Sequence, residues 1–154
     1  MPKLTGHRLA VDLPGGWDGR IFRRDLDRFS AERGGQSGAA LQVASFGLPA
    51  VVADFGNGAV ERMAPSDVLV MLVEYGPESV GTPLFAASGP PTLGPGDFSP
   101  ATLLRALPNQ AGSQTFFSAN GRAFCLYVVI GDAGQRSQLA PRARSVVGSI
   151  EIAG

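Results

Sequence analysis

The segment that decides the fold covers residues 114–130 and reads QTFFSANGRAFCLYVVI. At its centre, Asn120-Gly121 is the preferred pair for a two-residue type I′ hairpin turn, because both central residues of that turn need a positive φ. The register that this turn sets places Phe117 opposite Phe124. We therefore predict an antiparallel hairpin whose second strand is apolar on both faces.

The rest of the sheet is predicted from shorter patterns. Residues 68–73 form another run that is apolar on both faces, which is typical of a central strand with cover above and below. Residues 8–13 alternate between apolar and polar, as a half-buried strand does, and residues 19–24 could pair back on them. Residues 39–46 predict one further strand.

Three helical segments are expected to cover this sheet. A stripe of apolar residues between 139 and 150 predicts a C-terminal helix, and Pro141 must lie in its first turn, since a proline further along would break it. Residues 100–107 fit a short helix with Ser99 as its N-cap, and residues 57–63 fit a helical turn. The C-terminal helix would cover one face of the sheet and the two shorter segments the other.

These parts predict one domain, residues 1–154, of the α/β (α+β) class. The expected architecture is an α/β/α sandwich around a mainly antiparallel central sheet. The chain of 154 residues leaves little room for a second domain, and 44% hydrophobic residues supply a sizeable core. Charged residues make up 17%, which argues against disorder and hints that a partner covers part of the surface.

Composition also excludes several kinds of partner. Basic and acidic residues balance at 13 each, so the chain has no electrostatic footprint for nucleic acid. No stretch approaches the ~20 apolar residues of a membrane span, and the N-terminus lacks the apolar core of a signal peptide. A single cysteine cannot form an internal disulfide. We expect a cytoplasmic protein without a membrane span.

Metal centres and catalytic sites are not indicated. A metal centre needs several converging ligands, and the chain has one histidine, His7, and one cysteine, Cys125. Cys125 lies in an apolar run and is expected in the core, while any Ser-His-Asp or Cys-His site would depend on His7. The glycine loop at residues 56–61 has Glu61 where a dinucleotide fingerprint has its third glycine. We assign no catalytic residue, no metal ligand and no cofactor.

Short motifs in order along the chain resemble a known superfamily. They are the segment LPGGW at 13–17, the apolar hairpin, and VVGSIEI at 146–152. Together they resemble the Mog1/PsbP-like superfamily of α/β/α sandwich domains, and the chain is also similar to proteins of high-GC actinobacteria. The members resembled are mostly non-enzymatic: a nuclear-transport factor, a photosystem subunit and bacterial lipoproteins. The resemblance implies a binding or accessory role and transfers no catalytic residue.

The first functional hypothesis is a non-catalytic domain that binds another protein. Its surface would combine Trp17, Phe55 and Phe85, the last two on the loops 47–61 and 76–98. A cluster of arginines interleaved with acidic residues and phenylalanines is either a solvated, locally paired face or a second partner surface. Its members are Arg20, Phe22, Arg23, Arg24, Arg28, Phe29 and Arg33.

Glu74 leads to a second hypothesis. It closes the apolar run 68–73, and a buried carboxylate there needs a positive partner or a raised pKa. Arg122, which opens the other apolar strand, is the candidate partner in a salt bridge at the end of the sheet. Alternatively, Glu74, Tyr75 and Arg122 line the cleft of a small hydrolase or ligand-binding enzyme. The third hypothesis is a self-assembling subunit, because low surface charge is compatible with contacts between copies.

Overall fold

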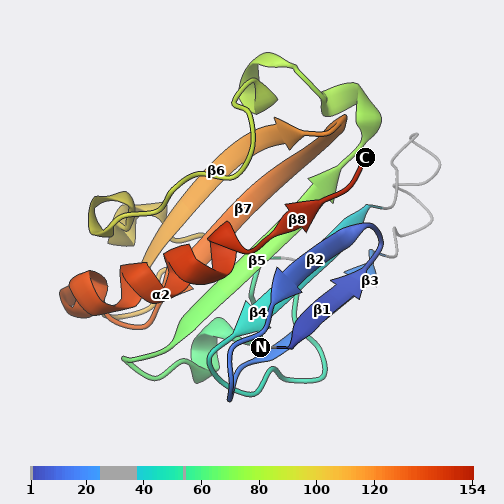
Figure 1. The fold of residues 1–154 in the computed structure, drawn as a ribbon. Coiled ribbons are helices and arrows are strands. Elements are labelled where there is room, and N and C mark those ends of the chain that lie inside the picture. The colour runs from blue at the N-terminus through green and yellow to red at the C-terminus, as the bar shows by residue number, and fades with distance from the viewer. Residues whose placement is uncertain (1, 25–37, 54) are drawn as a thin grey trace.

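The computed structural model describes residues 2–24, 38–53 and 55–154, in which eight strands form two antiparallel sheets beside one α-helix (Figure 1). The larger sheet has the order β3-β4-β5-β7-β6, and the smaller sheet has the order β1-β2-β8. The strands are β1 (Lys3–Gly6), β2 (Leu9–Asp12), β3 (Asp18–Arg23), β4 (Ala39–Ala44), β5 (Val68–Tyr75), β6 (Ala111–Ala119), β7 (Arg122–Ile130) and β8 (Glu151–Ile152), and the helix is α2 (Arg136–Gly148). The α+β class is therefore correct.

The predicted hairpin is confirmed as β6 and β7. Asn120 and Gly121 have φ angles of 51° and 76°, as a type I′ turn requires, and Phe117 pairs with Phe124. Strand β7 is buried along its whole length, and β5 is buried over residues 68–73. Both strands lie inside the larger sheet, which explains why neither alternates between apolar and polar residues.

The helix α2 and the smaller sheet cover one face of the larger sheet (Figure 1). The main core lies between these layers, and it includes Val11 of β2, Leu72 of β5, Phe124 of β7 and Val147 of α2. The opposite face is covered by irregular chain and the 3₁₀ turn Val60–Arg62, chiefly from residues 46–53, 55–63 and 103–107. Apolar contacts on both sides of the larger sheet are the main stabilising contribution to the fold.

One edge of the larger sheet, along β6, is covered by other segments of the chain. Along β6, the main chain of Ser118 bonds to Ala87 and Gly89, and Gly112 exchanges two hydrogen bonds with Ser99. The segment between β5 and β6 thus protects this edge from pairing with another chain. Within this segment Phe85 and Leu93 are buried, whereas Leu84 is exposed.

Strand pairing near the N-terminus differs from the prediction. Residues 18–23 pair with β4 and not with β2, whose partner is the unpredicted strand β1. The β1–β2 turn consists of His7 and Arg8, with φ angles of 48° and 61°. These two residues are unusual in a type I′ turn, which normally uses Asn and Gly, so the sequence carried no turn signal there.

Two helix predictions also need correction. Residues 100–107 form only a 3₁₀ turn at Pro100–Thr102, although Ser99 accepts a hydrogen bond from the Ala101 amide as expected of an N-cap. The chain then stays irregular because Leu103 packs against the sheet and the Leu104 amide donates to the Tyr127 hydroxyl. Pro141 lies inside α2 and beyond its first turn. Pro141 and Ser137 are both exposed, so the carbonyl that loses its helical donor can bond to water.

Candidate functional site

Arg122 lies where β7 begins, at the end of the larger sheet, and is only 6% exposed. All five of its N–H groups have acceptors. Its Nε and one Nη2 proton donate to the two carboxylate oxygens of Glu74, at 2.9 and 3.0 Å. The others donate to the main-chain carbonyls of Arg8 and Ala153, at 3.0 Å each, and of His7, at 3.2 Å. We call these five residues the Arg122 clamp.

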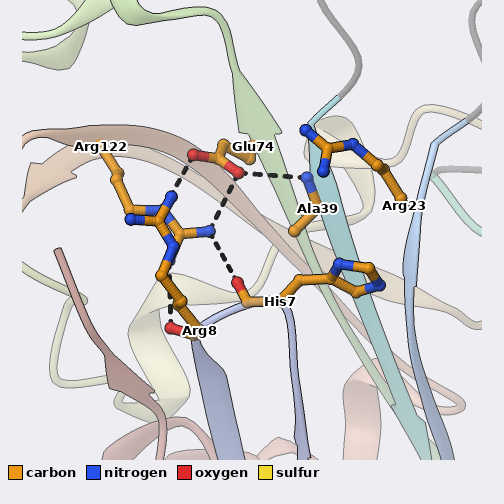
Figure 2. A pocket seen from close by; sticks show the side chains of 6 residues that line it. All are labelled: His7, Arg8, Arg23, Ala39, Glu74 and Arg122. Atoms are coloured by element: carbon orange, nitrogen blue, oxygen red, sulfur yellow. Dashed lines mark hydrogen bonds and ion pairs between the residues drawn. The ribbon is translucent and has the colours of Figure 1, made fainter.

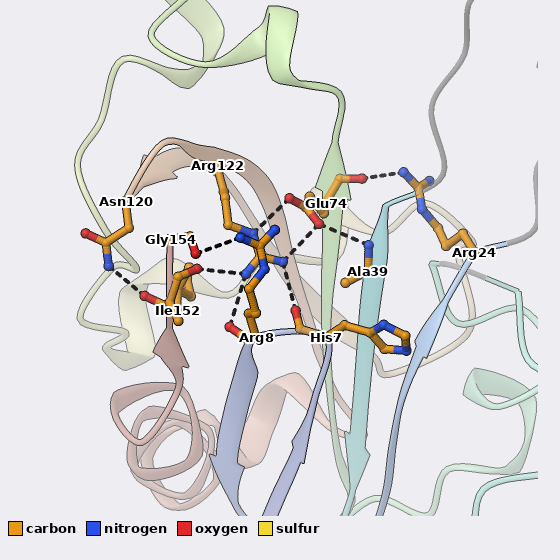
Figure 3. Close-up of polar contacts among 10 residues, drawn as sticks. His7, Arg8, Arg24, Ala39, Glu74, Asn120, Arg122, Ile152 and Gly154 are labelled. Carbon is orange, nitrogen blue, oxygen red and sulfur yellow. Dashed lines mark hydrogen bonds and ion pairs between the residues drawn. The ribbon is translucent and has the colours of Figure 1, made fainter.

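The clamp joins parts of the chain that are far apart in sequence (Figure 3). It ties the hairpin strand β7 to the β1–β2 turn, to the end of β5 and to the segment after β8. Further bonds close the same region: Asn120 Nδ2 donates to the Ile152 carbonyl, and Arg8 Nη1 donates to an oxygen of Gly154, both at 2.6 Å. A buried arginine with every donor satisfied stabilises this arrangement.

The Glu74 carboxylate accepts hydrogen bonds from Arg122 and from β4. Besides both Arg122 bonds, its Oε1 accepts from the Ala39 amide at 3.1 Å. Burial raises the pKa of Glu74, but the Arg122 hydrogen bond, the Ala39 amide and the nearby charges of Arg122 and Arg8 together lower it below its ordinary value. The predicted salt bridge between Glu74 and Arg122 is confirmed.

A polar cavity of about 70 Å³ opens beside the clamp (Figure 2). Its lining residues are His7, Arg8, Arg23, Ala39, Glu74 and Arg122. A second cavity of about 170 Å³ adjoins it, sharing Arg8, Arg23 and Glu74 and extending to Tyr75, Gly76 and Pro77. Gly38 also lines the larger cavity, and its missing side chain makes room for the carbonyl of Glu74. Arginines dominate this end of the molecule.

The chemistry of this site favours binding over proton transfer. An ionised Glu74 held in a bidentate salt bridge is a poor general acid and a weak general base at neutral pH. Cys125 is buried, and burial raises the pKa of its thiol to about 11, so little reactive thiolate forms. Residues 2–24, 38–53 and 55–154 contain no group of three or more His, Cys, Asp or Glu side chains that could hold a metal ion.

The structure does not bring the three predicted surface aromatics together. Phe85 is buried against Tyr75 and Phe116, with ring centroids 5.2 and 5.5 Å away. Phe55 packs edge-on against Tyr127, at 6.2 Å, on the face covered by irregular chain. Trp17 instead packs against the main core and lies under the Arg142 guanidinium, 5.4 Å from its ring centroid. These loops thus carry core anchors where we expected an exposed aromatic surface.

The predicted cleft residues are only partly brought together. Glu74 and Arg122 line the smaller cavity, and Tyr75 lines only the larger one beside it. Sequence reasoning missed Arg8 and Arg23 as neighbours of Glu74, because the strand pairings that place them there were not predicted. No local pattern could have indicated this arrangement, because His7 and Arg8 are not typical residues of a type I′ turn. Arg28, Phe29 and Arg33 of the predicted arginine cluster lie outside the described residues.

The lowered pKa of Glu74 predicts how acid affects stability. Because the folded protein holds this carboxyl below its ordinary pKa of 4.5, the salt bridge stabilises the fold above that pH and loses its effect as the pH falls through the folded-state pKa. The difference in free energy of unfolding between wild type and Glu74→Gln should be constant near neutrality and shrink below pH 4.5. Urea unfolding from pH 7 to pH 3 measures it.

The matched control for this prediction is Glu151→Gln, which removes an exposed carboxylate paired with Lys3. We expect it to change stability by less than about 0.5 kcal/mol at every pH. A Glu74→Gln difference that stays constant down to pH 3 would contradict the prediction.

Comparisons with protein-family models, with curated proteins and with solved structures found no match. In the part of the chain that the structure describes, no helix has the length and apolar character needed to cross a membrane.

Proposed function

We propose that this protein is a non-catalytic protein-binding domain whose partner adds an extended segment to the edge of β3. The observation that supports it is the outer edge of β3, which pairs with no other strand among the described residues and lies beside an apolar cavity. The Arg24 amide donates to the carbonyl of Gly38, the residue just before β4. Because hydrogen-bonded positions alternate along an antiparallel pair, the main chain of Phe22 and Arg20 also faces β4. The main chain of Ile21 then faces outward, and no described residue donates to or accepts from it.

The cavity beside this edge can take a partner side chain. It measures about 340 Å³ and is lined mainly by apolar groups, from Phe22, Ala50, Val51 and Val52 together with Arg20. Val51 is 84% exposed, the most exposed large hydrophobic residue described. In strand addition, main-chain hydrogen bonds provide affinity and pockets for alternate side chains provide specificity. The edge and the cavity together supply both elements.

Charge favours an acidic partner segment over a second copy of this chain. Strand β3 carries Arg20 and Arg23 against one acidic residue, Asp18. The Arg20 guanidinium donates to the carbonyls of Pro49 and Ala50, which are neutral, and among the described residues its charge has no counter-ion. Two copies would bring the same positive strands together, whereas an acidic segment would complement them.

The resemblance to the Mog1/PsbP-like superfamily supports the same proposal, because the members resembled are mostly non-enzymatic. We further propose that this fold is related to the α/β/α sandwich of that superfamily. Fold similarity alone would not define a function. The proposal therefore depends on the β3 edge and its cavity.

A displayed library of random peptides, selected on the full chain, tests the proposed function. We expect enrichment of extended peptides with one apolar residue flanked by Asp or Glu, and slower hydrogen exchange of the Ile21 amide in the complex. Val51→Glu should weaken the selected peptides about tenfold or more, because it places a carboxylate in the apolar cavity.

The control for that variant is Leu104→Glu, which changes another exposed apolar residue, 54% exposed, away from the cavity. It should leave peptide affinity unchanged. Peptides that bind the Val51→Glu variant as tightly as wild type, or that leave the Ile21 amide unprotected, would refute the proposed site. A dimer in light scattering that Val51→Glu dissociates would instead identify the partner as a second copy.

A further inference from the structure

We propose that the cavity beside the Arg122 clamp is a binding site for a small oxyanion, a phosphate or carboxylate group. This site is separate from the apolar cavity at β3 and does not depend on the proposed protein partner. It lies at the end of the larger sheet, where the β1–β2 turn meets β4, β5 and β7 (Figure 2).

The charge of the lining favours an anion. Among the described lining residues, Arg8 and Arg122 contribute two positive charges and Glu74 one negative charge, so the formal excess is one (two minus one) without counting Arg23. The volume of about 70 Å³ suits a group the size of a phosphate or carboxylate and excludes a nucleotide base or a large ring. A partly enclosed cleft whose lining carries a net charge concentrates ions of the opposite sign.

The two cavities differ in how well they suit an anion. The carboxylate of Glu78 lies against Gly76, which lines the larger cavity and not the smaller one. A second acidic group there would repel an anion. We therefore place the oxyanion in the smaller cavity, with any remainder of the ligand extending into the larger one.

Donors for the anion come from Arg8, while Arg122 supplies a fixed charge. All five Arg122 donors are occupied, which holds its guanidinium in place but leaves none to bind a ligand. Arg8 donates through Nη1 to Gly154, and its other N–H groups have no acceptor among the described residues. Arginine N–H groups in a fixed fork match the oxygens of phosphate and carboxylate groups.

The backbone at this turn gives an independent argument. His7 and Arg8 both hold positive φ angles, 48° and 61°, which cost about 1–2 kcal/mol each for residues other than glycine. The neighbouring β6–β7 turn has the same type of geometry and uses Asn120-Gly121, the pair that this turn favours. The strained pair, His7 and Arg8, lines the cavity. Strained backbone is found preferentially at ligand sites, which supports a ligand here.

The double substitution His7→Asn/Arg8→Gly tests the site without disrupting the turn. It installs the favoured turn pair and removes the cationic donor, so we expect unchanged or higher stability together with loss of anion binding. The probes are inorganic phosphate and acetate, titrated at constant ionic strength with chloride and followed by amide chemical shifts. Wild type should bind phosphate saturably, and the variant should bind it at least about tenfold more weakly, as the loss of charge-assisted hydrogen bonds predicts.

Two controls make the result specific. Arg144→Gln removes the same charge from an exposed position on α2 and should bind phosphate as wild type does. Val51→Glu should also bind normally, which separates failure of this site from failure of the β3 site. Tighter phosphate binding would indicate a phosphorylated ligand, and tighter acetate binding a carboxylate. No saturable shift with either probe, equal binding by the double variant, or equal weakening by Arg144→Gln would overturn the proposal.

Discussion

Replacing Arg122 with leucine should lower the free energy of unfolding by about 3–5 kcal/mol, because it leaves a half-buried carboxylate without its partner. Glu74 would lose both of its side-chain donors, and the carbonyls of His7, Arg8 and Ala153 would lose theirs. The desolvation cost of these groups in the folded protein would remain, while the bonds that offset it would be gone. Urea unfolding followed by circular dichroism measures the change.

Two comparison variants test whether this cost comes from the unpaired charge. The double variant Glu74→Leu/Arg122→Leu should recover much of the lost stability. Replacing both members of a buried ion pair with apolar residues destabilises a fold much less than leaving one charge without its partner. Lys3→Ala breaks an exposed ion pair whose side chains are 45% and 66% exposed, and it should cost at most about 1 kcal/mol. If Arg122→Leu costs no more than Lys3→Ala, the Arg122 clamp does not stabilise the fold.

Replacing Phe124 with alanine should cost a similar amount, about 3–5 kcal/mol, by opening a cavity in the main core. Its side chain is fully buried and stacks on Phe117 with ring centroids 5.6 Å apart. The Arg122 guanidinium lies over the Phe124 ring, 5.2 Å from the ring centroid. The substitution therefore removes core contacts and a cation–π interaction together. Thermal and urea unfolding both report the loss.

The prediction for Phe124 also includes coupling to the clamp. In a double-mutant cycle, Phe124→Ala and Arg122→Leu should together cost less than the sum of the single changes, because residues in contact share an interaction energy. The exposed substitution Leu104→Ala should cost less than about 0.5 kcal/mol. Additive costs at Phe124 and Arg122 would show that the ring does not support the guanidinium.

These variants concern the region where the fold closes. The Arg122 clamp holds the β1–β2 turn and the segment after β8 against the larger sheet (Figure 3). The oxyanion cavity opens beside these same residues. A charged, rigid end of the sheet can thus serve stability through Arg122 and ligand binding through Arg8, and the variants above separate the two roles.

Predictions made from local patterns succeeded where the signal lies within one element. The Asn-Gly pair predicted the β6–β7 hairpin and its register, and the apolar runs predicted β5 and β7 as central strands. The apolar stripe predicted the C-terminal helix, although Pro141 lies deeper in α2 than expected. In the same way, an arginine and a glutamate at the ends of two central strands predicted their salt bridge.

Predictions failed where the outcome depends on which segments meet. Phe85 and Phe55 looked like exposed loop aromatics, but each covers part of the sheet. The helix expected at 100–107 is absent beyond Pro100–Thr102, because Leu103 and Leu107 pack against the sheet from irregular chain. Tertiary burial overrode local helical preference there.

The sequence by itself determined the α+β class, the central hairpin with its register, the C-terminal helix and the partner of Glu74. These features depend on the residues of a turn and on the spacing of apolar residues, both of which are set by residues close together in the sequence. Only the tertiary structure decided that β3 pairs with β4, that Arg122 reaches carbonyls 114 and 115 residues away, and that Arg8 and Arg23 border one cavity. The physical reason is that burial rewards any apolar face that finds cover, while the choice of cover depends on the packing of the whole chain.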